Sequence, residues 1–137
     1  MRRIGDYEAR VVERLLTLDE EARAVVKPLL RSMSVGEQLR DQDSWRITLK
    51  TEGEPEWPSR RRLEGKWRCD DGRSISADLT ILPGRTLFLE IYAHTFDWSL
   101  DPLPDPDDLE LLDPDRPIVI VRTKRSPGPD LGKPNQG

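Results

Sequence analysis

The chain has 137 residues, of which 35% are hydrophobic and 35% are charged, and its formal net charge is −4. This length suits one domain with a single modest core, and the negative charge argues against a general affinity for nucleic acid or for an anionic membrane. No apolar stretch is long enough for a signal peptide or a membrane span, which predicts a cytoplasmic protein without a membrane partner.

The first third of the chain has apolar residues at helical spacing. Asp6 is a candidate N-cap, and the pattern after it predicts a helix over residues 7–17. A second helical pattern covers residues 18–33, with acidic residues near its positive end. Pro28 interrupts that pattern, so we expect either a kink or two short helical pieces.

After residue 33 the apolar residues recur at every second position, which indicates strands. The predicted strands are 33–39 (the weakest), 45–51, 63–69, 74–82 and 87–94. The last three are separated by short turn sequences, which predicts an antiparallel meander. A later apolar run, 118–122, reads as one further buried strand.

Both turns of the meander fit three-residue loops, Asp-Asp-Gly at 70–72 and Pro-Gly-Arg at 83–85. Loops of this length place the odd residues of all three strands on one face, which we expect to be the core face. The small pair Gly65 and Ala77 would let a helix approach this face closely. The predicted fold class is α+β, with two N-terminal helices packed on one face of an antiparallel β-meander of four to six strands.

The opposite face of the meander carries three acidic residues in one row: Glu64, Asp78 and Glu90. Carboxylates placed about 5 Å apart on neighbouring strands destabilise a sheet, so something should compensate for them. The candidates are Lys66 with Lys50 or Arg46, a divalent cation, or a basic partner. A carboxylate-pair hydrolase using Asp78 and Glu90 is a further alternative, although no calcium-loop motif and no other metal or cofactor motif is present.

The only histidine and the only cysteine are expected to be structural. His94 falls at the end of a strand on the polar face, about 13 Å along the strand from Glu90, which is too far for an acid–base pair. Cys69 lies beside a turn on the core face and is interpreted as a small packing residue. One cysteine cannot form an internal disulfide.

Two charged stretches lie outside the helical and alternating patterns. Residues 57–62 join Trp57 to three arginines, Arg60 to Arg62, in a predicted long loop that could contact nucleic acid, although most such runs are only solvated. Residues 97–115 contain eight acids, no basic residue and repeated proline, which predicts a segment wrapped over the surface.

The leucines of this acidic segment are expected to anchor it, namely Leu103, Leu109, Leu111 and Leu112. The segment is either a rim that packs back on the sheet or an acidic docking surface for a basic partner. For the docking surface, the predicted partner-binding residues are Trp98, Asp101, Asp105, Asp107 and Asp108. A single domain is expected over residues 1–123, followed by a disordered tail over 124–137 that is rich in proline and glycine.

A helical N-terminus followed by CDDGRSISADLTILPGRTLFLEI (69–91) and FDWSLDPLP (96–104) resembles a family of small bacterial domains of unknown function. The matching positions are Asp71, Gly72, Leu79, Gly84, Leu87, Leu89, Glu90 and Ile91, within a resemblance that covers residues 7–112. Where that family has a glycine-rich segment similar to DGGMGS, this chain has RDQDSW (40–45), so no site is transferred through that loop. Some members are similar to immunity proteins that neutralise toxins, and the resemblance therefore implies binding and no catalytic residue.

Two functional hypotheses follow. The first is a small cytoplasmic protein-interaction module, for example an immunity or inhibitor protein, whose acidic surface binds a basic partner such as a toxin. The alternative is a hydrolytic enzyme that uses Asp78 and Glu90. A pocket beside these two carboxylates would favour the alternative, and a flat sheet face would count against it.

Overall fold

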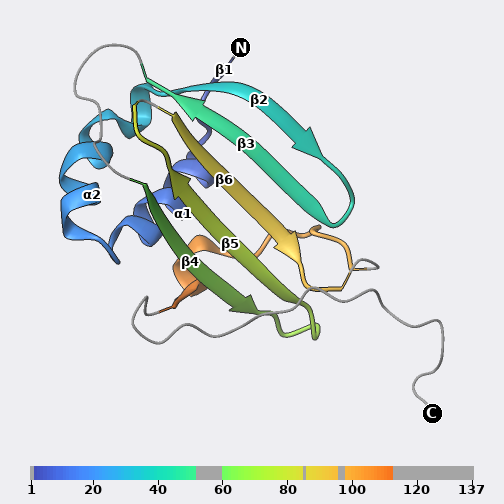
Figure 1. Cartoon of the computed structure of the whole chain (residues 1–137). Helices are drawn as coiled ribbons and strands as arrows, with labels where there is room; N and C mark the ends of the chain where they lie inside the picture. Colours follow the sequence, from blue (N-terminus) through green and yellow to red (C-terminus); the bar gives the residue numbers. More distant parts are fainter. Residues whose placement is uncertain (1, 52–59, 85, 96–97, 113–137) are drawn as a thin grey trace, which may run out of the picture.

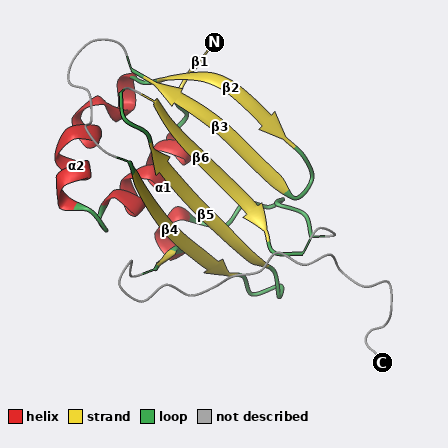
Figure 2. Ribbon diagram, in the orientation of Figure 1, coloured by secondary structure: helices red, strands yellow, loops and turns green. Residues whose placement is uncertain are grey.

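The computed structural model describes residues 2–51, 60–84, 86–95 and 98–112. Over these residues the protein is an α+β fold, with N-terminal helices and one seven-stranded antiparallel sheet (Figures 1 and 2). The predicted fold class is confirmed. Among the described residues, no helix has the length and apolar character needed to cross a membrane.

The first helix, α1, spans Asp6–Leu16. Its N-cap is Gly5 and not Asp6, because the Gly5 N–H donates to the Glu8 carboxylate at 2.6 Å and Asp6 already has helical geometry. Arg2 binds the same carboxylate through both of its terminal nitrogens, so Glu8 is only 2% exposed and fully satisfied. This buried acid fixes the start of the helix.

The second helical pattern divides into α2, Glu20–Val26, and a 3₁₀ helix η1, Lys27–Ser32. Asp19 caps α2, since its side chain accepts a hydrogen bond from the Ala22 N–H at 3.0 Å. Pro28 lies in the first turn of η1, where a missing N–H costs least. The alternative of two short helical pieces is therefore the one observed.

The sheet has the strand order β1-β2-β3-β6-β5-β4-β7. Its strands are β1 (Arg2–Arg3), β2 (Ser34–Arg40), β3 (Ser44–Lys50), β4 (Arg61–Arg68), β5 (Ser74–Ile81), β6 (Thr86–Ala93) and β7 (Glu110–Leu111). The expected number was four to six, and the strands that sequence patterns did not indicate are the two-residue edge strands β1 and β7. Arg61 and Arg62, expected in a loop, open β4 and continue its alternation.

Both predicted three-residue loops are confirmed. The Cys69 N–H donates to the Arg73 carbonyl at 2.9 Å, and the Leu82 N–H donates to the Thr86 carbonyl at 3.1 Å. Gly72 supplies the positive φ, 91°, that the first loop requires. The register follows from the loops, so that Leu63, Leu79 and Leu89 face one another across β4, β5 and β6.

The odd residues of these strands form the core face, which the helices cover (Figure 1). Its largest members are at most 4% exposed, namely Leu63, Trp67, Ile75, Leu79, Leu89 and Ile91. The helices contribute fully buried Val11, Val12, Leu15, Leu16 and Leu30. The opposite face of β3, β6, β5 and β4, called the open face below, is not covered by any described helix.

Close approach at Gly65 is made by a leucine and not by a helix. A Cβ atom at this position would lie 2.8 Å from the Leu109 Cγ, so the Leu109 side chain occupies the space that the glycine leaves. At Gly65 the close neighbour is therefore Leu109 and not the expected helix, although α1 does contact β4 and β5. The predicted strand 118–122, the tail 124–137 and Trp57 lie outside the described residues.

Candidate functional site

The segment 98–112, the described part of the acidic stretch, runs along α1 and β4 at one end of the sheet (Figure 1). It contains the short 3₁₀ helix η2, Pro106–Asp108, and the edge strand β7. Leu109 is fully buried, and the other predicted anchors, Leu103, Leu111 and Leu112, are half-buried. Leu100 is also fully buried, an anchor that its position between polar residues did not reveal.

Polar contacts also fix the backbone of this segment, in addition to the leucines. Four side chains donate to its carbonyl oxygens: Tyr7 to Pro104 (2.8 Å), Trp67 to Asp105 (2.8 Å), Arg14 to Leu109 (3.0 Å) and Arg73 to Ser99 and Pro102 (2.8 Å each). These donors come from α1, β4 and the β4–β5 loop. A segment without regular secondary structure over most of its length is thereby held in one conformation.

With the inner side of the segment anchored, its carboxylates point outward. We call Asp101, Asp105, Asp107 and Asp108 the acidic ridge; all four are exposed. Arg10 pairs with Asp105 and Asp107 at 3.3 Å each, and Arg40 pairs with Asp101 at 3.1 Å. Side-chain exposures of 56% to 78% on the acids mean that these pairs are screened by water and hold the arginines only weakly.

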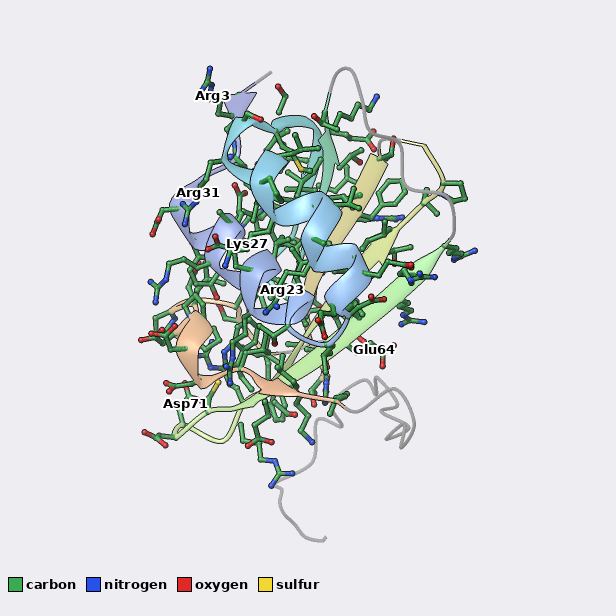
Figure 3. All side chains as sticks on the ribbon, turned by 90° about the vertical axis from the view of Figure 1, so that its left-hand side faces the viewer. Arg3, Arg23, Lys27, Arg31, Glu64 and Asp71 are labelled. Atoms are coloured by element: carbon green, nitrogen blue, oxygen red, sulfur yellow. The ribbon has the colours of Figure 1, made fainter. Side chains whose placement is uncertain are left out.

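Trp98 behaves differently from the other predicted contact residues. Its side chain packs against the core and is half-buried, and the backbone N–H of Trp98 donates to the Thr95 carbonyl at 3.0 Å. It therefore helps to anchor the start of the segment. The η2 part of this segment lies at the same end of the molecule as Asp71, whereas Arg23, Lys27 and Arg31 lie on the helical layer (Figure 3).

The acidic row of the open face has the predicted register, with Glu64 opposite Asp78 and Asp78 opposite Glu90. Its compensating cation is Arg62, which bonds Asp78 at 3.0 Å and Glu64 at 2.9 Å. Lys66, the predicted partner, makes no ion pair with any described carboxylate. The prediction missed Arg62 because that residue was assigned to a loop.

Asp78 is the most constrained carboxyl group of this row, at 7% exposure. Burial raises its pKa above the ordinary value, and the hydrogen bond and charge of Arg62 act in the opposite direction. The Tyr92 hydroxyl also donates to Asp78, at 3.4 Å. Burial and the neighbouring Asp78 charge raise the pKa of Tyr92 to about 12, so its proton stays in place at neutral pH.

A hollow of about 330 Å³ opens on this face beside the acidic row. The side chains that shape it include Arg46, Arg60, Arg62, Asp78, Phe88 and Glu90. The Arg46 guanidinium lies over the Phe88 ring, 5.4 Å from its centroid. The sequence did not predict this hollow, which depends on side chains from four neighbouring strands and on how far the arginines reach.

His94 is held between two serines on the same face. Its Nδ1 lies 3.0 Å from the Ser74 Oγ and its Nε2 lies 2.5 Å from the Ser76 Oγ. A Ser–His contact can activate a nucleophile, but Ser76 is only 2% exposed, so a substrate cannot reach its hydroxyl. The contact therefore supports a structural role for His94.

Neither Cys69 nor a metal-binding cluster adds a further candidate site over the described part of the chain. Cys69 is half-buried, and burial raises the pKa of its thiol, which disfavours the reactive thiolate. Among the described residues, no group of three or more His, Cys, Asp and Glu side chains is placed to hold a metal ion. No protein-family model, curated protein or solved structure matches the chain.

Proposed function

We propose that the protein is a small cytoplasmic protein-interaction module that binds a basic partner protein through the acidic ridge, as an immunity or inhibitor protein does. The observation that carries this proposal is the anchoring of segment 98–112. Buried leucines and four side-chain donors hold its inner side, and four carboxylates are presented on its outer side. A surface that is already ordered loses little conformational entropy when a partner binds.

The internal ion pairs of the ridge are compatible with this role. Exposed pairs such as Arg10 with Asp107 contribute only about 0 to 1 kcal/mol, so lysines or arginines of a partner can replace them. Replacement releases Arg10 and Arg40 to solvent and places the partner's charges against all four carboxylates. Complementary charge of this kind accelerates association and selects the partner.

The test is co-expression of the full chain with each protein encoded by a neighbouring gene, followed by affinity capture. Asp107→Lys/Asp108→Lys reverses two charges of the ridge and leaves the Asp105 cap of η2 intact. Glu20→Lys/Glu37→Lys is the matched control, because both residues are exposed and lie on α2 and in the middle of β2, outside the ridge segment. The proposal predicts a basic protein that the wild type and the control retain and that the ridge variant loses.

Two results contradict the proposal. One is that no neighbouring gene product is retained by the wild type. The other is a partner that both charge-reversed variants retain equally, because the ridge then contributes nothing to binding.

A hydrolytic enzyme is the second candidate, and the hollow beside Asp78 and Glu90 is the observation that favours it. The raised pKa of Asp78 suits a proton donor, while Glu90 makes no ion pair with a described cation. Against this candidate, Arg62 and Tyr92 both bind the Asp78 carboxylate. Turnover of glycoside substrates that Asp78→Asn and Glu90→Gln each abolish, with both variants folded, would support it.

A further inference from the structure

The hollow on the open face has the size and the lining of a small-molecule site. Its volume of about 330 Å³ lies at the lower end of the range of ligand pockets, about 300 to 1,000 Å³. Arg46 reaches it from β3, and Arg60 and Arg62 reach it from the β4 side. Phe88 of β6 lies between the arginines in the strand order, so the hollow combines an aromatic surface with cations on both sides.

Arg46 and Arg60 make no ion pair with any described carboxylate. Elsewhere in the described chain, arginines commonly pair with carboxylates, as Arg10, Arg31 and Arg40 do. Two guanidinium groups in one hollow therefore keep their donors available. A guanidinium group presents a planar fork of N–H donors that matches a carboxylate or a phosphate.

The position of Arg46 supports the interpretation that its donors are available to a ligand, because it does not pair with the carboxylate nearest to it in the sheet. Glu90 is its direct neighbour across the β3–β6 pair, yet the guanidinium lies over the Phe88 ring instead of pairing with that carboxylate. A cation–π contact of this kind does not occupy the N–H donors of the guanidinium with an acceptor atom. Because Arg46 also lines the hollow, its donors are available to a molecule that enters it.

Arg62 adds a third cation, which the protein holds in place. Its Nη2 bonds Asp78 and its Nε bonds Glu64, while Tyr92 bonds Asp78 from the neighbouring strand. This network neutralises Asp78 and fixes one wall of the hollow before any ligand binds. Among the lining carboxylates, Glu90 alone has no described cation as a partner.

We propose that this hollow binds a small organic oxyanion, a carboxylate or phosphate carried on a ring, with Arg46 and Arg60 donating to the anion. Phe88 supplies apolar contact to the ring. The site lies on the open face of the sheet and goes beyond the proposed protein–protein contact, which uses the acidic ridge. Glu90 opposes the bound charge and limits the affinity.

Isothermal titration of the full chain with three probes tests the proposal. Phenyl phosphate carries both the ring and the anion, inorganic phosphate carries only the anion, and phenol carries only the ring. We expect saturable one-to-one binding of phenyl phosphate that is tighter than binding of either part. Benzoate, titrated in parallel, reports which anion fits better, and binding of benzoate or of phenyl phosphate supports the proposal.

Substitutions of the lining residues test whether phenyl phosphate binds in this hollow and whether each charged side chain raises or lowers its affinity. Arg46→Gln and Arg60→Gln should each weaken phenyl phosphate binding about tenfold, which corresponds to the loss of one charge-assisted contact. Glu90→Gln should tighten it severalfold, because it removes the opposing charge. Arg23→Gln is the matched control, an exposed arginine on the helical layer, and should leave the affinity unchanged.

Three results overturn the proposal. The first is no saturable binding of phenyl phosphate or benzoate up to about 10 mM, the range of very weak ligands. The second is equal weakening by Arg23→Gln and Arg46→Gln, which would mean unspecific attraction. The third is weaker binding in Glu90→Gln, which would mean that the carboxylate binds the ligand and that the hydrolase candidate describes this hollow better.

Discussion

Asp78 shows how one buried carboxyl group organises the open face of the sheet. It accepts hydrogen bonds from Arg62 and Tyr92, and it is 7% exposed although no described helix covers this face. Arg62 and Tyr92 shield it from water, and burial is the largest cause of its raised pKa. The charged form of Asp78 is therefore less favourable in the folded protein than in the unfolded chain.

The variant Asp78→Asn tests this balance. A folded pKa above the unfolded value means that the stability contributed by protonated Asp78 is present at low pH and is lost as the pH rises through the folded pKa. Asparagine is always neutral and keeps an oxygen for Arg62 and Tyr92. We expect the variant to be more stable than the wild type at pH 7, by about 0.2 to 1 kcal/mol.

Urea unfolding at several pH values is the measurement. The advantage of Asp78→Asn should shrink as the pH falls through the raised pKa toward 3.8, where the wild-type carboxyl group becomes neutral as well. Added salt should change it little, because burial and not exposed repulsion is the main cause. A variant that is less stable at pH 7 would show that the Arg62 pairing outweighs burial.

The sequence predicted the neighbours of Asp78 within the sheet but not its partner. Alternation and loop length placed Glu64, Asp78 and Glu90 in one row, as observed. The partner Arg62 belongs to a run of three arginines whose composition indicates a loop. Extending the alternation backward from Leu63 would have placed Arg62 on the open face, one diagonal step from Asp78.

Among the structural elements, segment 98–112 depends on the contact between Leu109 and Gly65. Any residue with a Cβ atom at position 65 would collide with Leu109, since this Cβ would lie 2.8 Å from the leucine Cγ. We expect Gly65→Ala to lower the free energy of unfolding by about 1 to 3 kcal/mol. Gly36→Ala is the matched control, because its Cβ would lie 3.5 Å from the nearest atom, the flexible Lys50 side chain.

A double-mutant cycle assigns the cost to this contact. Leu109→Ala alone removes a fully buried leucine and should cost about 2 to 5 kcal/mol. In the presence of Leu109→Ala, the further change Gly65→Ala should cost less than it does in the wild type, because the collision is gone. Strictly additive costs would show that the leucine does not occupy the space beside Gly65.

The Tyr7 hydroxyl is a second, polar link between α1 and the segment. It donates to the Pro104 carbonyl at 2.8 Å, and burial raises the pKa of Tyr7 well above its ordinary value. Tyr7→Phe removes this bond and should cost about 1 kcal/mol. Tyr7→Phe should accelerate hydrogen exchange more at the Leu109 amide than at the Leu79 amide in the central strand β5. Equal acceleration at both amides would contradict a local link.

Element prediction succeeded where the period was regular and the loops were short. Hairpins β4–β5 and β5–β6 followed from period two and three-residue loops alone. The course of segment 98–112 did not, because its contacts are long-range, joining residues up to 97 positions apart in the pair Tyr7 and Pro104. Its leucines were predicted as anchors, but only the folded chain shows that the place beside Gly65 receives one of them.

At the scale of the whole molecule, the acidic ridge gathers four exposed carboxylates within residues 101–108. The helical layer carries exposed residues of both signs, among them Glu20, Glu21, Arg23 and Lys27 (Figure 3). The net charge of −4 therefore understates the acidity of the ridge. A basic ligand should concentrate at the ridge, because opposite charges attract over about 8 Å at physiological salt.

Amide NMR of the full chain during titration with a deca-lysine peptide tests the ridge most directly. The account predicts that the largest shifts fall on residues 101–108 and that they diminish with added salt. Asp107→Lys/Asp108→Lys should abolish them, while Glu20→Lys/Glu37→Lys should not. Shifts distributed evenly over all exposed acids, or centred on the exposed glutamates Glu20 and Glu37, would contradict a docking role for the acidic ridge.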